Sequence, residues 1–197
     1  MLNTRAPLQC APSWHGLCAS EICGFVARKP PAYKLPPMSL LDDPRHANFA
    51  IAELGDLLLV EAFGPAPPEA VKRLEEAAIQ FGRARPGRAV FMHCVSANAR
   101  NEMPGDATRQ AMVSFAKNAA QSFRCATLLL ETPGFSGAAF RSLFAGIFFL
   151  ARLELPLKIQ SDATAALAWL RQHSPSAALP DIAQVTRERA RLWSLMP

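Results

Sequence analysis

The chain has 197 residues, of which 50% are hydrophobic and 19% are charged, so it can enclose one sizeable core and is too apolar to be disordered throughout. Its formal net charge is +5, and four bases and one acid within residues 1–37 account for +3 of this. The remaining residues are nearly neutral, which argues against nucleic-acid binding because phosphate recognition needs clustered lysine and arginine.

Residues 1–37 differ from the rest of the chain. They hold six of the 17 prolines and show no sustained periodicity, so we expect a disordered extension upstream of a domain that starts at Met38. No apolar stretch typical of a signal peptide follows Arg5. Thiolate and imidazole suit zinc, but the spacing here lacks a Cys-x2-Cys pair, so no metal site is predicted from Cys10, His15, Cys18 and Cys23. Five cysteines, an odd number, indicate reduced thiols and a cytoplasmic protein.

Regular patterning begins at residue 49. Two strand-like runs, Phe49–Leu54 and Leu57–Phe63, flank a Gly-Asp dipeptide that suits a tight hairpin. A helix is expected over Pro67–Phe81, with its prolines in the first turn, where no backbone donor is lost. The apolar run Ala89–Val95 then predicts a buried central strand. A second helix is expected over Asp106–Phe123, with Asp106 as its N-cap.

The second half repeats the alternation of strand and helix. Strands are expected over Cys125–Leu130 and Leu157–Gln160, and helices over Ser136–Leu153 and Ser161–Arg171, the last capped by Ser161. This order predicts an α/β domain over residues 38–173, with a mixed or mostly parallel sheet of four to five strands covered by helices. Residues 174–197 are expected to form a linker and a C-terminal helix over Asp181–Met196, which docks on the core or on a partner.

No transmembrane segment is predicted. The most apolar window, Ser142–Ala151, lies between Arg141 and Arg152 and has half of the roughly 20 residues needed to span a bilayer.

The end of the domain carries a resemblance to a known family. Its residues read Leu157-Lys158-Ile159, then Ser161-Asp162, then Ala166-Leu167-Ala168-Trp169-Leu170. Together with the Gly134-Phe135 turn into a helix that bears Arg141, this resembles the SpoIIAA-like branch of the STAS superfamily, which is grouped with SEC14-type lipid-binding domains and includes bacterial proteins of unassigned function. The resemblance covers about Phe49–His173 and implies a STAS-like fold and a regulatory, protein-binding role.

One departure from that family concerns its phosphorylated serine. Anti-sigma-factor antagonists carry an Asp-Ser pair after the central strand, whereas no such pair occurs between His93 and Pro104. The resemblance therefore does not imply a phosphorylation switch for this chain.

The sequence shows no catalytic or cofactor motif. His93 and Cys94 are neighbours in a predicted strand and must point to opposite faces of the sheet, so they cannot form a dyad. Glu61 is expected at a sheet edge and Glu131 in solvent, so we do not expect them to act as an acid–base pair.

The loop that follows the central strand is the strongest candidate for a site, because open α/β sheets bind ligands at the carboxyl ends of their strands. Its polar residues are Ser96, Asn98, Arg100 and Asn101. The turn at Gly134 and Phe135 leaves the next strand at the same edge, so the two loops are expected to flank one surface. Phe149 lies off the apolar stripe of its helix and is a candidate partner contact.

Three functions remain open. The first is a non-enzymatic interaction or regulatory module that binds a protein partner or a second copy of the chain. The second is a SEC14-like binder of a lipid or other apolar molecule in a pocket under the helix Ser136–Leu153. The third is an enzyme that uses the loop Ser96–Asn101.

Overall fold

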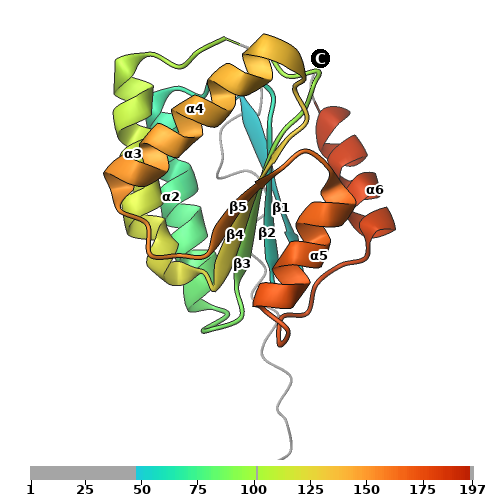
Figure 1. The fold of residues 1–197 in the computed structure, drawn as a ribbon. Helices are drawn as coiled ribbons and strands as arrows, with labels where there is room; N and C mark the ends of the chain where they lie inside the picture. The colour runs from blue at the N-terminus through green and yellow to red at the C-terminus, as the bar shows by residue number, and fades with distance from the viewer. Residues whose placement is uncertain (1–47, 101, 196–197) are drawn as a thin grey trace, which may run out of the picture. The chain divides into compact units, whose positions relative to one another are not determined.

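A five-stranded mixed sheet lies at the centre of the part of the protein described by this computed structural model, residues 48–100 and 102–195 (Figure 1). Its strands lie in chain order, and β1 runs antiparallel to β2 while the other neighbours are parallel. The predicted α/β class is therefore confirmed. The strands are β1 (Phe49–Leu54), β2 (Leu57–Ala62), β3 (Val90–Val95), β4 (Cys125–Leu130) and β5 (Leu157–Gln160).

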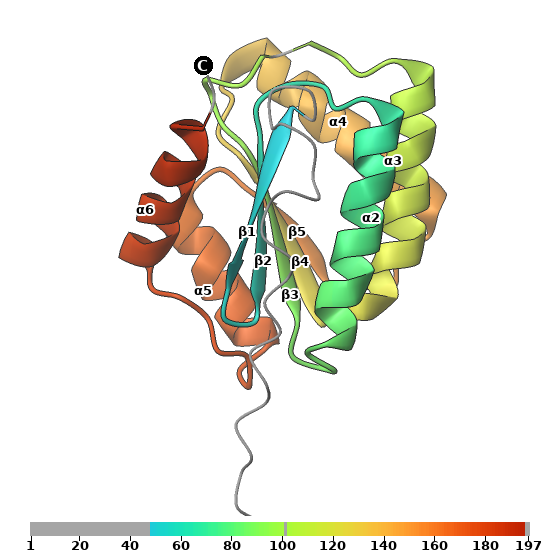
Figure 2. The same ribbon diagram turned by 180° about the vertical axis from the view of Figure 1, so that it is seen from behind.

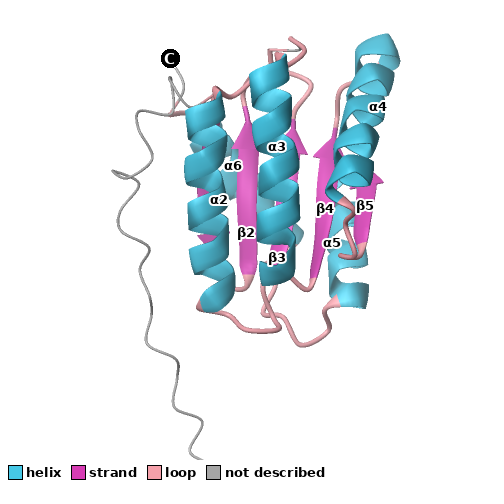
Figure 3. Cartoon of the chain, turned by 90° about the vertical axis from the view of Figure 1, so that its left-hand side faces the viewer, coloured by secondary structure: helices cyan, strands magenta, loops and turns pink. Residues whose placement is uncertain are grey.

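Helices cover both faces of the sheet, as Figures 1 and 2 show from opposite sides. One face carries three helices, side by side in Figure 3: α2 (Pro68–Arg83), α3 (Asp106–Ala119) and α4 (Gly134–Ala151). The other face carries α5 (Ala163–His173) and α6 (Ile182–Trp193). The expected C-terminal helix thus docks on the core, and the expected extension over residues 1–37 lies outside the described residues.

The hairpin between β1 and β2 turns at Gly55, as predicted. Gly55 has φ +64°, and a Cβ there would lie 2.3 Å from the carbonyl oxygen of Ala178. The amide of Asp56 donates to that same carbonyl at 3.0 Å, and the amide of Ala178 donates to Asp56 Oδ2 at 2.8 Å. The turn therefore holds the linker that leads from α5 to α6.

Strand β3 is covered by helices on both faces, and its residues alternate between the two layers. Met92 and Cys94 pack in a cluster with residues of α5 and α6, including Leu167 and Leu192. Phe91 packs on the other face. The prediction that His93 and Cys94 point to opposite faces is confirmed, because His93 lies against Phe91 and Phe144 on the face covered by α2, α3 and α4.

Several predicted helix ends differ from the structure by one to four residues. Gly105, not Asp106, is the N-cap of α3, and that helix passes at Ala120 into a short 3-10 turn over Ala120–Ser122. Asp162, not Ser161, caps α5, and its side chain accepts a hydrogen bond from the amide of Ala165 at 2.8 Å. In each case the cap is the residue with extended backbone before the first helical turn, whose position the residue type alone does not determine.

Helix α4 has one face on the sheet and one face exposed. By length and composition its 18 residues suffice to cross a membrane, with a mean hydropathy of 1.4, although one such helix is weak evidence because core helices pass the same test. The window Ser142–Ala151 considered from the sequence is only part of this apolar helix, which extends over Gly134–Ala151 and includes Arg141. Its buried residues, Phe140, Phe144, Ile147 and Ala151, anchor it on the sheet.

Candidate ligand-binding cavity

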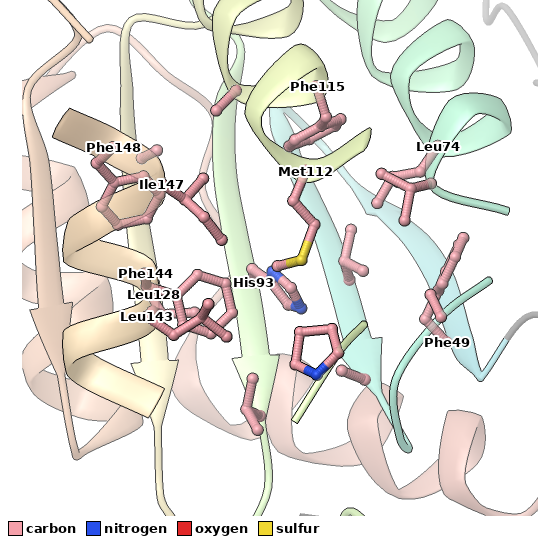
Figure 4. Close-up of a pocket in the computed structure, with 18 of the residues that line it drawn as sticks. Phe49, Leu74, His93, Met112, Phe115, Leu128, Leu143, Phe144, Ile147 and Phe148 are labelled. Carbon is pink, nitrogen blue, oxygen red and sulfur yellow. The ribbon is translucent and has the colours of Figure 1, made fainter. Parts of the chain in front are cut away.

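An apolar cavity of about 140 Å³ lies between the sheet and the layer formed by α2, α3 and α4. Figure 4 shows side chains from the sheet and all three helices converging on it. Its walls are aromatic and aliphatic, and include Phe49, Leu74, Met112, Phe115, Phe144 and Ile147. Small residues on α3 and β4, among them Ala116 and Ala126, leave the space open because a larger side chain at either position would fill it.

His93 is the polar group at the centre of this cavity (Figure 4). The alternation of β3 directs it there, and its ring lies edge-on to that of Phe144 with centroids 5.7 Å apart. The side chain is half-buried, and it lines the cavity. This burial lowers the pKa of His93 from 6.5 to about 4, so the imidazole is neutral near pH 7.

The imidazole nitrogens of His93 have no hydrogen-bond partner among residues 48–100 and 102–195, and they keep some accessible surface. Two threonines also line the cavity, but both hydroxyls already donate to backbone carbonyls. Thr108 Oγ1 donates to the oxygen of Ala66 at 3.1 Å, and Thr127 Oγ1 donates to that of Lys158 at 3.0 Å. The hydroxyl proton of Thr108, in the first turn of α3, is therefore not available to donate to a ligand.

The loop after β3 forms part of the cavity wall through Ala99, Arg100 and Glu102. The backbone amide of Arg100 donates to the carbonyl of Phe63 at 2.8 Å, and its guanidinium donates to Asn48 Oδ1. Gly64 lies directly beneath this side chain, where a Cβ would come within 3.2 Å of Arg100 Nε. Arg100 is thus the predicted site residue that the structure places at the cavity.

The other residues predicted in that loop lie elsewhere. Ser96 is 6% exposed, and its Oγ accepts from the amide of Asn98 at 3.2 Å, which makes it a turn residue. Asn98 is exposed and does not line the cavity, and Asn101 lies outside the described residues.

The residues predicted around α4 face solvent. Gly134 opens the helix with φ +68°, Phe135 is 89% exposed and Phe149 is 82% exposed. The expectation that Phe149 lies off the buried stripe is confirmed. The two loops do meet at their bases, where Thr132 Oγ1 donates to the carbonyl of Ser96 at 3.5 Å, but Phe135 and Phe149 do not line the cavity.

A buried ion cluster on the opposite face of the sheet corrects the expectation for Glu61 and Glu131. Glu61 is fully buried, lies in β2 between two other strands, and accepts from Arg189 Nε at 2.7 Å and from Trp193 Nε1 at 2.9 Å. Arg189 also donates to both carboxylate oxygens of Glu131 at 2.8 Å. One guanidinium therefore joins the two carboxylates, which leaves neither free for acid–base chemistry.

Arg189 and Trp193 were not foreseen as residues that hold α6 to the sheet. The signal was present in their spacing, because Val185, Arg189, Leu192 and Trp193 share one helical face, which makes Arg189 the exception on an apolar stripe. Cys94 lies beneath this cluster. Burial raises the pKa of its thiol well above the usual value, and the negative charge of Glu61 raises it further, so Cys94 is a protonated core thiol.

In the described part of the chain, no group of three or more His, Cys, Asp or Glu side chains could hold a metal ion. His93 and Cys94 lie on opposite faces of the sheet, and the side chains of Glu61, Arg189 and Glu131 hydrogen-bond to one another.

No protein-family model matches the chain, and no curated protein is similar enough in sequence to count as a relative.

Proposed function

We propose that this domain is a non-enzymatic binding module that holds a small apolar molecule in the cavity beneath α3 and α4. The cavity itself carries the proposal, since core side chains normally fill such space and an unfilled volume of this size costs stability. Its wall is apolar apart from His93 and groups that already have partners or lie in the loop after β3.

The volume limits the ligand. An apolar protein cavity of about 150 Å³ holds a molecule the size of benzene. The 140 Å³ found here suits the same size class, about one six-membered ring. A long lipid chain would need further space from movement of α4, so a ring-sized molecule is the simpler occupant.

A matched pair of variants on one helix tests this proposal. Ala116 is 7% exposed and lines the cavity, whereas Ala107 is exposed on the same helix. Toluene is the probe, and its binding is measured as a rise in melting temperature with ligand concentration. Ala116→Leu should abolish the rise because the new side chain occupies the cavity, while Ala107→Leu should bind toluene as the unaltered protein does. Equal binding by all three proteins would show that toluene binds elsewhere.

A STAS-like architecture, related to SEC14-type domains, remains part of the proposal. Strands in chain order with α5 after the last of them, and the partly buried Trp169 of α5 stacked on His173, support it. An experimental structure compared with known STAS domains would test this assignment.

A second candidate function is the protein-binding or regulatory module. The observation that favours it is the exposed apolar face of α4, where Phe149 is 82% and Leu150 is 67% exposed. Large apolar side chains grouped on one surface commonly mark a contact with another protein, of which a second copy of the chain is the simplest. An enzyme acting at the loop Ser96–Asn101 has less support, because Ser96 is committed to a turn.

A further inference from the structure

We propose that the molecule bound in the cavity is a compact ring that carries one neutral hydrogen-bonding group, such as a phenol, a cyclic alcohol or a cyclic ketone, and that His93 binds this group. This inference rests on the proposed function and specifies its ligand. It is carried by the position of the unpartnered imidazole at the centre of an apolar space.

The first argument is the missing partner of His93. A polar group inside a fold is less stable without a hydrogen bond, and such groups in folded proteins nearly always have a protein or water partner. The described residues supply none for this imidazole. A single water at the imidazole would leave the apolar space unfilled, whereas a ring with one polar group would both bind the imidazole and fill that space.

The second argument is the chemistry of a neutral imidazole. One ring nitrogen donates a hydrogen bond and the other accepts one, so the ring matches a hydroxyl or a carbonyl equally well. In Figure 4 the imidazole lies beside Met112 and Phe144, and Phe49 lines the far side of the cavity, so a bound ring would have apolar contacts on its remaining sides. The arrangement is that of many ligand sites, which combine an apolar wall with a few polar groups that set orientation.

The third argument excludes charged groups from the buried part of the ligand. Arg100 and Glu102 are the charged side chains among the described residues that line the cavity. Both belong to the loop after β3, both are exposed, and the guanidinium of Arg100 already binds Asn48. A carboxylate or ammonium beside His93 would therefore be buried without a counter-charge, which is far more costly than burying a hydroxyl.

The test compares phenol with toluene, which has a methyl group in place of the hydroxyl. Dissociation constants for both are measured by ligand-observed NMR on the full chain, the His93→Leu variant and the His93→Gln variant. His93→Leu should weaken phenol binding roughly five- to tenfold relative to its effect on toluene, which is the usual worth of one hydrogen bond. His93→Gln retains a donor and an acceptor and should restore much of the preference.

The outcomes separate this inference from the proposed function. If toluene and phenol both bind and His93→Leu changes both equally, the cavity is a ligand site but His93 does not recognise a polar group, and the inference is overturned alone. If neither probe binds the unaltered protein, both proposals fail together.

A second measurement needs no variant and applies even if His93→Leu does not fold. Benzoate has the same ring with a charged group, so it should bind the unaltered protein at least tenfold more weakly than phenol. Benzoate binding as tight as that of phenol would overturn the requirement for a neutral group.

Discussion

At the scale of single residues, two polar side chains inside the fold, Glu61 and His93, differ in whether they have hydrogen-bond partners. Glu61 is fully buried and receives hydrogen bonds from Arg189 and Trp193. His93 is half-buried among mostly apolar side chains and has no hydrogen bond to the described residues. The contacts of Glu61 are explained by stability alone, because burial without a partner costs free energy, whereas His93 is the group that we propose binds the polar part of a ligand.

His93 should make stability depend on pH. Its pKa is about 4 in the folded protein and near 6.5 when unfolded, so the unfolded state binds more protons between these values. Stability from this group is therefore complete above pH 6.5 and falls as the pH drops toward 4, by about 3 kcal/mol in total. Urea denaturation of the unaltered protein and His93→Gln from pH 4 to 8 measures the effect. Identical pH profiles would contradict the prediction, since all other titrating groups are shared.

Arg189→Met should be strongly destabilising. It leaves the carboxylate of Glu61 buried without the guanidinium that balances its charge, and removing one member of a buried ion pair typically costs about 3–5 kcal/mol. Arg187, two residues earlier on α6 and exposed, provides the matched control. Arg187→Met should change the free energy of unfolding by no more than about 0.5 kcal/mol in denaturant titration. A similar small effect of both variants would mean that Arg189 does not hold the cluster in solution.

At the scale of elements, α4 presents two different faces. Phe140, Phe144 and Ile147 pack toward the sheet, while Phe149 and Leu150 face solvent. The buried face encloses the cavity, and the exposed face is the candidate contact for a partner. The two proposed functions therefore belong to opposite sides of one helix and can be tested separately.

Phe149→Asp should leave the fold intact and change the assembly state or release a partner, because Phe149 is 82% exposed. Phe144→Asp should unfold the domain, because this side chain is 5% exposed and its replacement would bury an unpaired charge. Circular dichroism with size-exclusion chromatography distinguishes the two results. Loss of helical signal in Phe149→Asp would show that α4 is covered on both sides, and an unchanged elution volume without loss of any bound protein would remove the support for an interface.

At the scale of the whole described domain, α6 closes the face of the sheet opposite the cavity (Figure 2). Its residues Val185 and Leu192 are fully buried, and its Arg189 donates to Glu61 in β2 and to Glu131, which follows β4. The turn at Asp56 holds the preceding linker through two hydrogen bonds to Ala178. Helix α6 thus stabilises the sheet on one face, and the cavity lies on the other face.

Removal of residues 181–197 should expose Cys94 to thiol reagents. Cys94 shares a cluster with Val185 and Leu192, whereas Cys125 hydrogen-bonds through its thiol to the carbonyl of Leu170 on α5. Brief alkylation followed by mass spectrometry should therefore label Cys94 in the shortened chain and not in the full chain, while Cys125 stays protected in both. Labelling of both cysteines would indicate that the whole domain had opened, and protection of Cys94 would show that α6 is not its cover.

The sequence by itself determined the strands, the helices and the faces of β3. Alternation placed His93 and Cys94 on opposite sides, and the helical spacing of α4 separated Phe149 from Phe144. These patterns depend on neighbours within one or two turns of chain, so they can be read locally. Helix caps were not determined in this way, as Asp162 shows, because backbone angles rather than residue type select the cap.

Only the tertiary structure decided what the two buried polar groups do. Arg189 meets Glu61 across 128 residues of sequence, so a carboxylate expected at a sheet edge became the centre of a closed ion cluster. The cavity beneath α3 and α4 likewise depends on the combined volumes of side chains from the sheet and three helices. Neither result follows from local periodicity, because periodicity indicates which side chains face inward, whereas the pairing of charges and the filling of space depend on which distant residues meet them there.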